Sequence, residues 1–226
     1  REFEQMEVEY FVRPADWEKS FEEWQKTMHA FAEAVGLPIA AVHELEVADG
    51  DRAHYSKRTI DFEFDYPFGR KELWGLAYRT DFDLKAHSET SKVDLNYLED
   101  GEKAEDRFTP HVIEPSLGVD RTVLAILASA YTVDELGGEE RSYLKLSPNS
   151  APVRVAVFPL LKNKPELVAK AREIYIDLKK AGIVAMFDDN GNIGKRYRRQ
   201  DEIGTPHCIT IDFDTLGERP EWKDTV

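Results

Sequence analysis

A short stretch of the chain, residues 111–121, combines residue types that could bind a charged substrate. Glu114, Ser116, Gly118 and Arg121 lie where an alternating pattern of residues changes into a helical one. Side chains alternate between the faces of a strand, so Glu114 and Ser116 are expected on one face. A carboxylate, a hydroxyl and an arginine at the start of a helix can serve a cationic group and a polyphosphate together. For this stretch alone, a capped helix with an ordinary surface arginine remains the alternative.

The first twelve residues predict a strand with two different faces. Its even positions are apolar (Met6, Val8, Tyr10 and Val12) and are expected to face a core. Its odd positions carry Phe3, Gln5, Glu7 and Glu9. That odd face could be solvated or could line a pocket.

The remaining pattern up to residue 149 predicts the elements that would position these residues. Asp16 could cap a helix with apolar positions at three- and four-residue spacing, which Gly36 would end. Alternation predicts strands at 58–66 and 72–79, and the polar run 85–107 is interpreted as a surface insertion.

Residues 150–226 show a different order of elements. Strands are predicted at 153–158, 184–187 and 209–213, with helices at 165–180 and 195–203 between them. Alternating strands and helices over so short a segment indicate a small α/β domain. We therefore divide the chain into domains 1–149 and 150–226.

Composition limits the class of protein. The chain has 226 residues, a formal net charge of −14 and a single cysteine, Cys208, which excludes an internal disulfide and favours the cytoplasm. No apolar run approaches the roughly 20 residues that a membrane helix needs. Residues 1–149 carry 17 Lys+Arg against 32 Asp+Glu, and residues 150–226 carry 13 against 12. The acidity argues against a general nucleic-acid binder such as a DNA-binding protein, and a polyanion would approach the second domain more easily.

Four strings, in order, carry a family resemblance. Residues 114–121, E-P-S-L-G-V-D-R, resemble motif 3 of class II aminoacyl-tRNA synthetases in the form used by glycyl-tRNA synthetases. Residues 1–7 resemble the second half of motif 2, and residues 72–81 resemble the segment between these motifs. Residues 188–206 resemble part of the family's anticodon-binding domain.

The resemblance implies a fold and an activity. The fold is an α+β class II catalytic domain, an antiparallel sheet with helices, followed by a small α/β anticodon-binding domain. The activity is ATP-dependent activation of glycine and its transfer to tRNA(Gly), with Mg²⁺ on the phosphates, by a homodimeric enzyme. Motif 1 and the first strand of motif 2 are missing and the last elements are cut short, so we expect a fragment that is inactive alone.

The resemblance also implies roles for individual residues. Glu7 would take the glycine ammonium group, Phe3 would stack on adenine, and Arg121 with Glu114 would be catalytic. The implied substrate-binding residues are Phe3, Glu4, Gln5, Met6, Glu7, Arg79, Glu114, Pro115, Ser116, Leu117 and Gly118. The implied ATP-binding residues are Arg1, Glu2, Phe3, Glu72, Leu73, Gly118, Val119, Asp120 and Arg121. The implied magnesium ligands are Glu72 and Glu114.

Three alternatives stay open in the sequence. Arg79 lies seven residues from Glu72, so a regular strand would send them to opposite faces; either the strand bulges or ends, or only one of them faces the ligand. Arg79 could also form a structural salt bridge. The basic run Lys195–Arg199 could bind phosphate and stack on bases, although such a helix is more often a solvated face. Finally, a non-catalytic synthetase-like protein could keep this fold to bind RNA or a partner.

Overall fold

The computed structural model describes residues 3–101 and 103–217, and the chain forms two compact units, Arg1–Ala125 and Ile126–Val226. The elements of the first unit are β1 (Gln5–Glu7), β2 (Tyr10–Val12), α1 (Trp17–Ala34), η1 (Ile39–Ala41), β3 (Val42–Glu46), β4 (Arg58–Tyr66), β5 (Gly69–Thr80), α2 (Phe82–Ser91), η2 (Ala104–Asp106) and β6 (His111–Gly118). Helix α3 (Val119–Ala130) continues directly from β6 across the boundary between the units. The predicted functional boundary near residue 150 remains a prediction.

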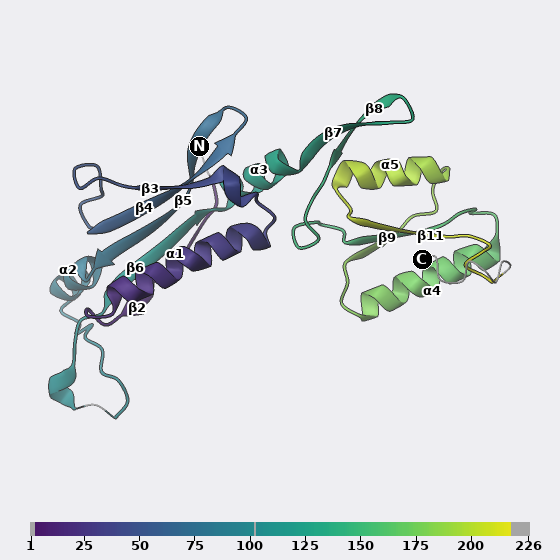
Figure 1. Ribbon diagram of the computed structural model, residues 1–226. Helices are drawn as coiled ribbons and strands as arrows, with labels where there is room; N and C mark the ends of the chain where they lie inside the picture. The colour runs from purple at the N-terminus through teal and green to yellow at the C-terminus, as the bar shows by residue number, and fades with distance from the viewer. Residues whose placement is uncertain (1–2, 102, 218–226) are drawn as a thin grey trace. The chain divides into compact units, whose positions relative to one another are not determined.

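An antiparallel sheet forms the body of the first unit. Its strand order is β1-β6-β5-β4-β3, and β2 also pairs with β6. Helix α1 runs along one face of the sheet (Figure 1). The core between them contains Phe21, Met28, Ala32, Ile60, Phe62, Phe64, Trp74, Leu76 and Ile113, all nearly inaccessible to solvent. The burial of these apolar side chains leaves the opposite sheet face available for polar residues.

The opening strand differs from the predicted continuous one because of Pro115. The register between β1–β2 and β6 is unbroken, and Val8 lies opposite Pro115, donating its backbone N–H to the proline carbonyl at 3.0 Å. Proline has no N–H to return, so the ladder lapses between β1 and β2. The prediction that the even face is buried was wrong for Met6 and Tyr10, which are 46% and 43% exposed at the edge of the sheet.

Helix α1 begins and ends close to the predicted residues. Asp16 occupies the N-cap, as predicted, but its side chain forms no capping hydrogen bond. Gly36, with a φ of 87°, follows the C-cap and allows the chain to turn back toward the sheet. The predicted insertion 85–107 contains the end of α2 and η2, and it is largely exposed.

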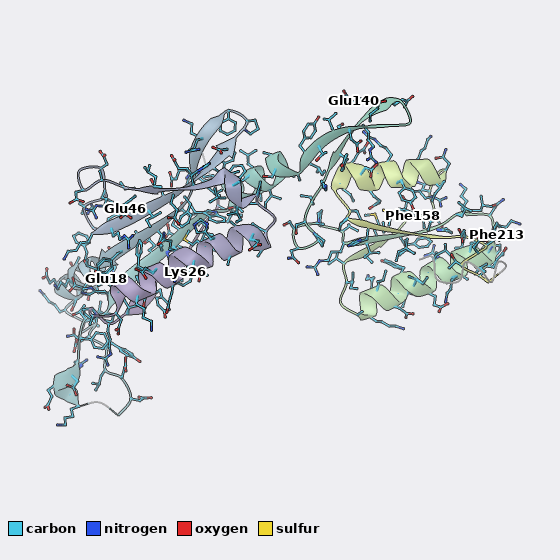
Figure 2. The ribbon with its side chains drawn as sticks, in the orientation of Figure 1. Glu18, Lys26, Glu46, Glu140, Phe158 and Phe213 are labelled. Carbon is cyan, nitrogen blue, oxygen red and sulfur yellow. The ribbon has the colours of Figure 1, made fainter. Side chains whose placement is uncertain are left out.

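The second unit contains a parallel sheet of order β10-β9-β11. Its elements are β7 (Tyr131–Leu136), β8 (Glu139–Leu144), β9 (Val155–Pro159), α4 (Pro165–Lys180), β10 (Ala185–Phe187), α5 (Ile193–Ile203) and β11 (His207–Ile211). Val157 packs against α4 through Leu167 and Ala171, whereas Phe158 contacts the ring of Tyr197 from α5 (Figure 2). The predicted order of strands and helices is confirmed.

A hairpin that the sequence did not reveal precedes this sheet. Strands β7 and β8 pair antiparallel around Gly137 and Gly138, which have φ values of 67° and 87°. Two residues with positive φ form a tight turn whose twist matches the strands, and glycine adopts that conformation without strain. Within the described residues, no helix combines the length and the apolar character needed to cross a membrane.

The basic run of α5 is not a uniform phosphate-binding face. Arg196 is 1% exposed and donates to the carbonyl oxygens of Pro159, Asp189 and Gly191. Arg199 is paired with Asp188. Arg196 therefore holds the 188–194 turn to the sheet, and the interpretation of the whole run as an RNA-binding surface was wrong for this residue.

We predict that Arg196→Met destabilises the second unit by at least about 2 kcal/mol, because buried carbonyls would lose charged donors. Native-state hydrogen exchange of the β9 and β11 amides measures this loss. Arg199→Met is the matched control, since Arg199 is 43% exposed and should cost much less. Equal losses in the two variants would contradict the structural role of Arg196.

Candidate active site

The sheet face opposite α1 contains a polar pocket of about 380 Å³. Strands β1, β6, β5 and β4 contribute to it, together with the loop that connects β3 and β4. The lining residues are Gln5, Glu7, Val47, Asp51, Arg52, Ala53, Tyr55, Thr59, Asp61, Glu72, Gly75, Leu76, Ala77, Arg79, Glu114 and Ser116.

Strand register explains how residues distant in sequence meet in this pocket. Glu7 lies opposite Ser116, which lies opposite Gly75, which in turn lies opposite Asp61. This row crosses four strands, and the next row places Glu114 beside Ala77. Gln5 links the row internally, donating its amide to Glu7 at 2.9 Å and to the hydroxyl of Ser116.

A bulge at Leu73 brings Glu72 to the pocket face, which Arg79 already shares with Gly75 and Ala77 by alternation. Phe62 pairs with Trp74 and Glu63 with Glu72, so Leu73 is an extra residue, and Leu73 and Trp74 are both buried. The extra residue changes the phase of the strand and turns Glu72 to the side of Gly75. The register shifts again between Tyr78 and Thr80, opposite β6, at Arg79. The strand therefore bulges, which was one of the alternatives that the sequence left open.

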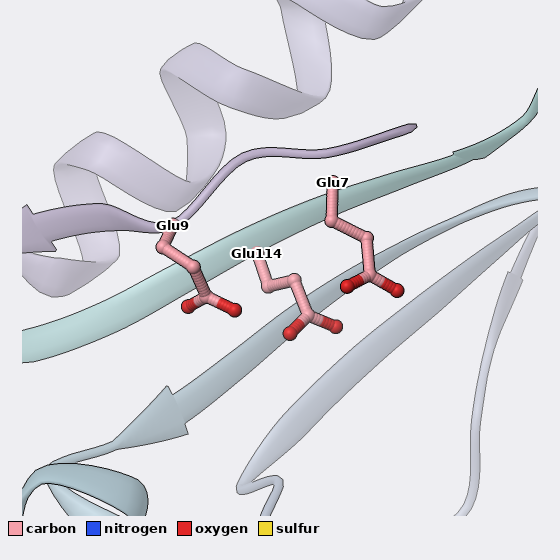
Figure 3. A group of neighbouring side chains, drawn as sticks. All are labelled: Glu7, Glu9 and Glu114. Carbon is pink, nitrogen blue, oxygen red and sulfur yellow. The ribbon is translucent and has the colours of Figure 1, made fainter. Parts of the chain in front are cut away.

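Three carboxylates meet at the side of the pocket that Glu7 and Glu114 line. Oxygen atoms of Glu7, Glu9 and Glu114 lie within 4.8 Å of one another, and their side chains point to the same side of the sheet (Figure 3). The unbroken register places Glu9 opposite Glu114, at a position where the strands exchange no hydrogen bonds and side chains approach most closely. Burial raises the pKa of Glu114, Arg79 opposes the rise, and Glu9 adds to it.

Arg79 compensates part of this negative charge. Its Nη1 donates to Glu114, its Nε donates to Asp83 at 2.8 Å, and its guanidinium lies 4.0 Å from the ring centroid of Tyr55. Burial opposes the charge on Arg79, but the two carboxylates outweigh burial and raise its pKa. Arg79 therefore forms an ion pair, as the structural alternative proposed, and it also lines the pocket.

The pocket as a whole is acidic. Its lining contains five carboxylates and two guanidinium groups, a formal balance of −3. Burial and the nearby Glu72 and Glu63 raise the pKa of Asp61. A cationic ligand would relieve this repulsion, whereas a free anion would need a counter-ion.

A second group of residues forms beside Glu72, at the start of α3. Arg121 pairs with Glu72 at 3.1 Å, and its guanidinium lies 5.9 Å from the ring centroid of Phe3. A Cβ on Gly118 would lie 3.0 Å from Cδ of Arg121, so glycine leaves room for the arginine to fold back. Asp120 accepts the backbone N–H of Glu4 at 2.8 Å and ties the opening strand to the helix.

The structure brings together some of the predicted site residues and separates others. Gln5, Glu7, Glu72, Arg79, Glu114 and Ser116 line the pocket. Phe3 and Arg121 form the adjoining contact, to which Glu4, Gly118, Val119 and Asp120 contribute through backbone and carboxylate contacts. Met6, Pro115 and Leu117 lie at alternate strand positions, and the side chain of Leu73 is buried. Arg1 and Glu2 lie outside the described residues.

Sequence reasoning did not select several pocket residues. Asp61 and Gly75 lie in predicted strands, and pairing the strands in register would have placed them beside Ser116. Asp83, which pairs with Arg79 but does not line the pocket, follows it by four residues across the turn from β5 to α2, where no periodic pattern predicts the pair. The β3–β4 loop, which supplies Arg52 and Tyr55, has no periodic pattern that predicts its position.

The fold has a counterpart among solved structures. A solved structure of a prolyl-tRNA synthetase from Giardia lamblia, in complex with prolyl-adenylate, aligns with 96% of this chain and 42% of its own, with a TM-score of 0.69 and 18% sequence identity. Residues 154–220 match the family model described as "Anticodon binding domain". The predicted fold class is confirmed: an antiparallel sheet with helices that resembles the class II synthetase catalytic region, followed by a parallel α/β domain that matches the anticodon-binding family.

In sequence, the chain is similar to glycine–tRNA ligases. It is 44% identical over 219 residues to that of Bacillus cereus (strain ZK / E33L), covering 97% of this chain and 46% of the relative. The Clostridium tetani ligase is 48% identical over 217 residues, covering 96% and 46% of the two chains. The Deinococcus radiodurans ligase is 43% identical over 247 residues, and the alignment covers 100% of this chain and 49% of the relative. The chain thus spans about half the length of these curated relatives.

We predict that Glu114→Gln makes the first unit more stable near pH 7. Burial raises the pKa of Glu114 above the ordinary 4.5. The protonated carboxyl therefore stabilises the folded state at low pH, and this stabilisation is lost as pH rises through the raised pKa. The neutral amide avoids that loss, and the two proteins should converge near pH 4. Urea unfolding followed by tryptophan fluorescence measures this, because Trp17, Trp24 and Trp74 lie in this unit. A less stable variant at pH 7 would mean that the Arg79 ion pair outweighs burial.

Proposed function

We propose that this chain supplies part of the active site and the anticodon-binding domain of a glycine–tRNA ligase. Its substrates are glycine, ATP and tRNA(Gly), and the assembled enzyme is a homodimer. The observation that carries the proposal is the row Glu7–Ser116–Gly75 across three strands, next to the buried Glu114. It combines carboxylates, a hydroxyl and a residue without a side chain in a small space.

The three-carboxylate cluster suits the ammonium group of glycine. Glu7 has its carboxylate oriented by Gln5, and Glu114 has one partner in Arg79, which leaves excess negative charge for a cation. Ser116 lies opposite Glu7 and two residues along β6 from Glu114, and it can hydrogen-bond to the substrate. A larger amino acid would bring a Cβ against these polar groups and leave some of them unpaired, which is costly in a buried site.

The Phe3–Arg121 contact suits ATP. The ring of Phe3 is 58% exposed and offers a face for adenine, while Arg121 is a planar donor for phosphate or for the adenine face. Glu72 pairs with Arg121 at 3.1 Å. The nucleotide phosphates would therefore lie between this contact and the glycine site.

Magnesium is the proposed metal on the phosphates. Glu72 fits a magnesium ligand because its carboxylate is 52% exposed and faces the pocket. The predicted second ligand, Glu114, has the correct donor type, but its carboxylate already accepts a hydrogen bond from Arg79. We therefore assign the metal to Glu72 and reserve Glu114 for the ammonium group. Bound magnesium would neutralise negative charge on the leaving pyrophosphate.

The reaction needs positioning more than side-chain chemistry. A glycine carboxylate oxygen attacks the α-phosphorus of ATP, and the bond to pyrophosphate breaks to give glycyl-adenylate. The terminal ribose hydroxyl of the tRNA then attacks the glycyl carbonyl, and AMP leaves with the bonding electrons. Glu7 and Glu114 would hold the ammonium group, and Arg121 would offset negative charge at the phosphates.

The second unit is proposed to bind the tRNA. Its support is the match to anticodon-binding domains and the exposed residues of α5, Lys195, Tyr197 and Arg198. Tyr197 is held by Phe158 and donates to or accepts from Thr210 at 2.8 Å, so its ring is presented in a fixed orientation. Such a ring can stack on an unpaired base.

A hybrid ligase tests the proposal. This chain would replace the segment that it matches in the Bacillus cereus ligase, and ATP–pyrophosphate exchange would be measured with glycine, alanine and serine. We expect exchange with glycine that exceeds both controls by at least about a hundredfold. Exchange no higher than with alanine or serine, in a folded hybrid, would favour a non-catalytic synthetase-like protein.

We predict that Gly118→Ala in the hybrid raises the KM for ATP by about tenfold, because a new Cβ displaces Arg121 from Phe3. The KM for glycine should change less than twofold. Gly194→Ala in α5 is the control, since its Cβ would meet nothing closer than 3.8 Å. A change in the glycine KM alone would show that Arg121 serves the amino acid instead.

A further inference from the structure

The chain after β5 has an unusual backbone conformation beside the pocket. Thr80 has a φ of 58°, and Lys92 is the other non-glycine residue with positive φ among the described residues. Lys92 is the C-cap of α2, where the left-handed conformation is common. Thr80 has no such role, and its branched side chain makes the conformation costly. Strain of this kind persists where the surroundings enforce it, often at functional sites.

The consequence of this conformation is the position of α2. Directly after Thr80, Asp81 occupies the N-cap and Asp83 lies in the first turn of the helix. Asp83 accepts a hydrogen bond from Nε of Arg79 at 2.8 Å. The bulge at Arg79 and the left-handed Thr80 thus fold the chain back, so that one short segment supplies both the arginine and its carboxylate.

Arg79 is held on three sides. Asp83 binds Nε, Tyr55 covers the guanidinium plane at 4.0 Å from the ring centroid, and Glu114 accepts from Nη1. The arginine side chain is 17% exposed, and that of Asp83 is 32% exposed. Since a guanidinium is planar, fixing Nε and one face also fixes the direction in which Nη1 points.

Asp83 does not line the pocket, so it acts on the pocket only through Arg79. Without it, the guanidinium would lose the contact that fixes its rotation. Glu114 would then face the carboxylates of Glu7 and Glu9 without a fixed cation. The other charged groups that line the same pocket are Asp51, Arg52, Asp61 and Glu72.

We propose that Asp83 is a positioning residue for the amino-acid site, which it serves by holding Arg79 against Glu114 through the turn at Thr80. This inference rests on the proposed function, because it assigns the amino-acid site to the Glu7–Glu9–Glu114 cluster. The expected effect is selective for the amino acid, since the Phe3–Arg121 contact lies beyond Glu72 and does not involve Asp83.

The first experiment uses the hybrid ligase with Asp83→Asn and Asp83→Glu. The asparagine variant should raise the KM for glycine about tenfold and leave the KM for ATP within twofold. The glutamate variant retains the carboxylate and should return the glycine KM to within about threefold of the unsubstituted hybrid. Asp65→Asn is the matched control, because Asp65 pairs with Nε of Arg70 at 2.9 Å on the same sheet but outside the pocket.

The outcomes separate the inference from a general loss of stability. Equal increases in both KM values, no change in the glycine KM, or the same change in Asp65→Asn would each overturn it. If Asp83→Asn raises the KM for glycine and Asp83→Glu raises it equally, the inference is also overturned.

A second experiment uses the 226-residue chain itself and does not depend on catalysis. The ¹⁵N-labelled guanidinium Nε–H of Arg79 should give an exchange-protected NMR signal, assigned with an Arg79→Lys variant. The signal should be lost in Asp83→Asn and kept in Asp83→Glu and Asp65→Asn. If the hybrid shows no glycine-dependent exchange, the proposed function fails, and the Arg79 signal still decides whether Asp83 positions the arginine. A signal unchanged in Asp83→Asn would overturn that role.

Discussion

The repulsion between two carboxylates on neighbouring antiparallel strands is the interaction on which the pocket depends. Glu9 and Glu114 lie opposite each other where the strands exchange no hydrogen bonds, so their side chains approach closely. Arg79 balances part of this charge, and Glu7 adds to it from the adjacent row. The pocket therefore has an excess of negative charge that a cationic ligand would relieve. Much of the surrounding structure consists of groups that hold these charges in place.

The backbone departs from a regular ladder at each of these groups. Pro115 interrupts the pairing opposite Val8, Leu73 changes the phase of β5 and turns Glu72, and the register shifts at Arg79 just before the turn at Thr80. Regular strands would have placed some of these charged side chains in the core beneath α1. Violations of local rules are expected where function requires them, and here they coincide with the pocket.

Periodicity predicted most of the helices and strands, but not β3, α2 or the β7–β8 hairpin. Helix α4 has the predicted bounds, and alternation correctly placed Glu114 and Ser116 on one face. Alternation could not predict the Leu73 bulge, because either of two consecutive apolar residues could be the extra one. The four basic residues of α5 look equivalent in sequence, and only packing distinguishes the buried Arg196. The β3–β4 loop is positioned by its contacts with β5, such as Tyr55 over Arg79, which no local pattern encodes.

The bulge at Leu73 has a consequence for how this sequence can change over evolutionary time. Deletion of Leu73 would remove the extra residue and leave a more regular pairing of β4 with β5. The same deletion would rotate Glu72 away from Arg121 and toward the hydrophobic layer. The number of residues between Glu72 and Arg79 therefore matters to the site separately from their identities, and a chain with a shortened β5 would have the sheet without the site.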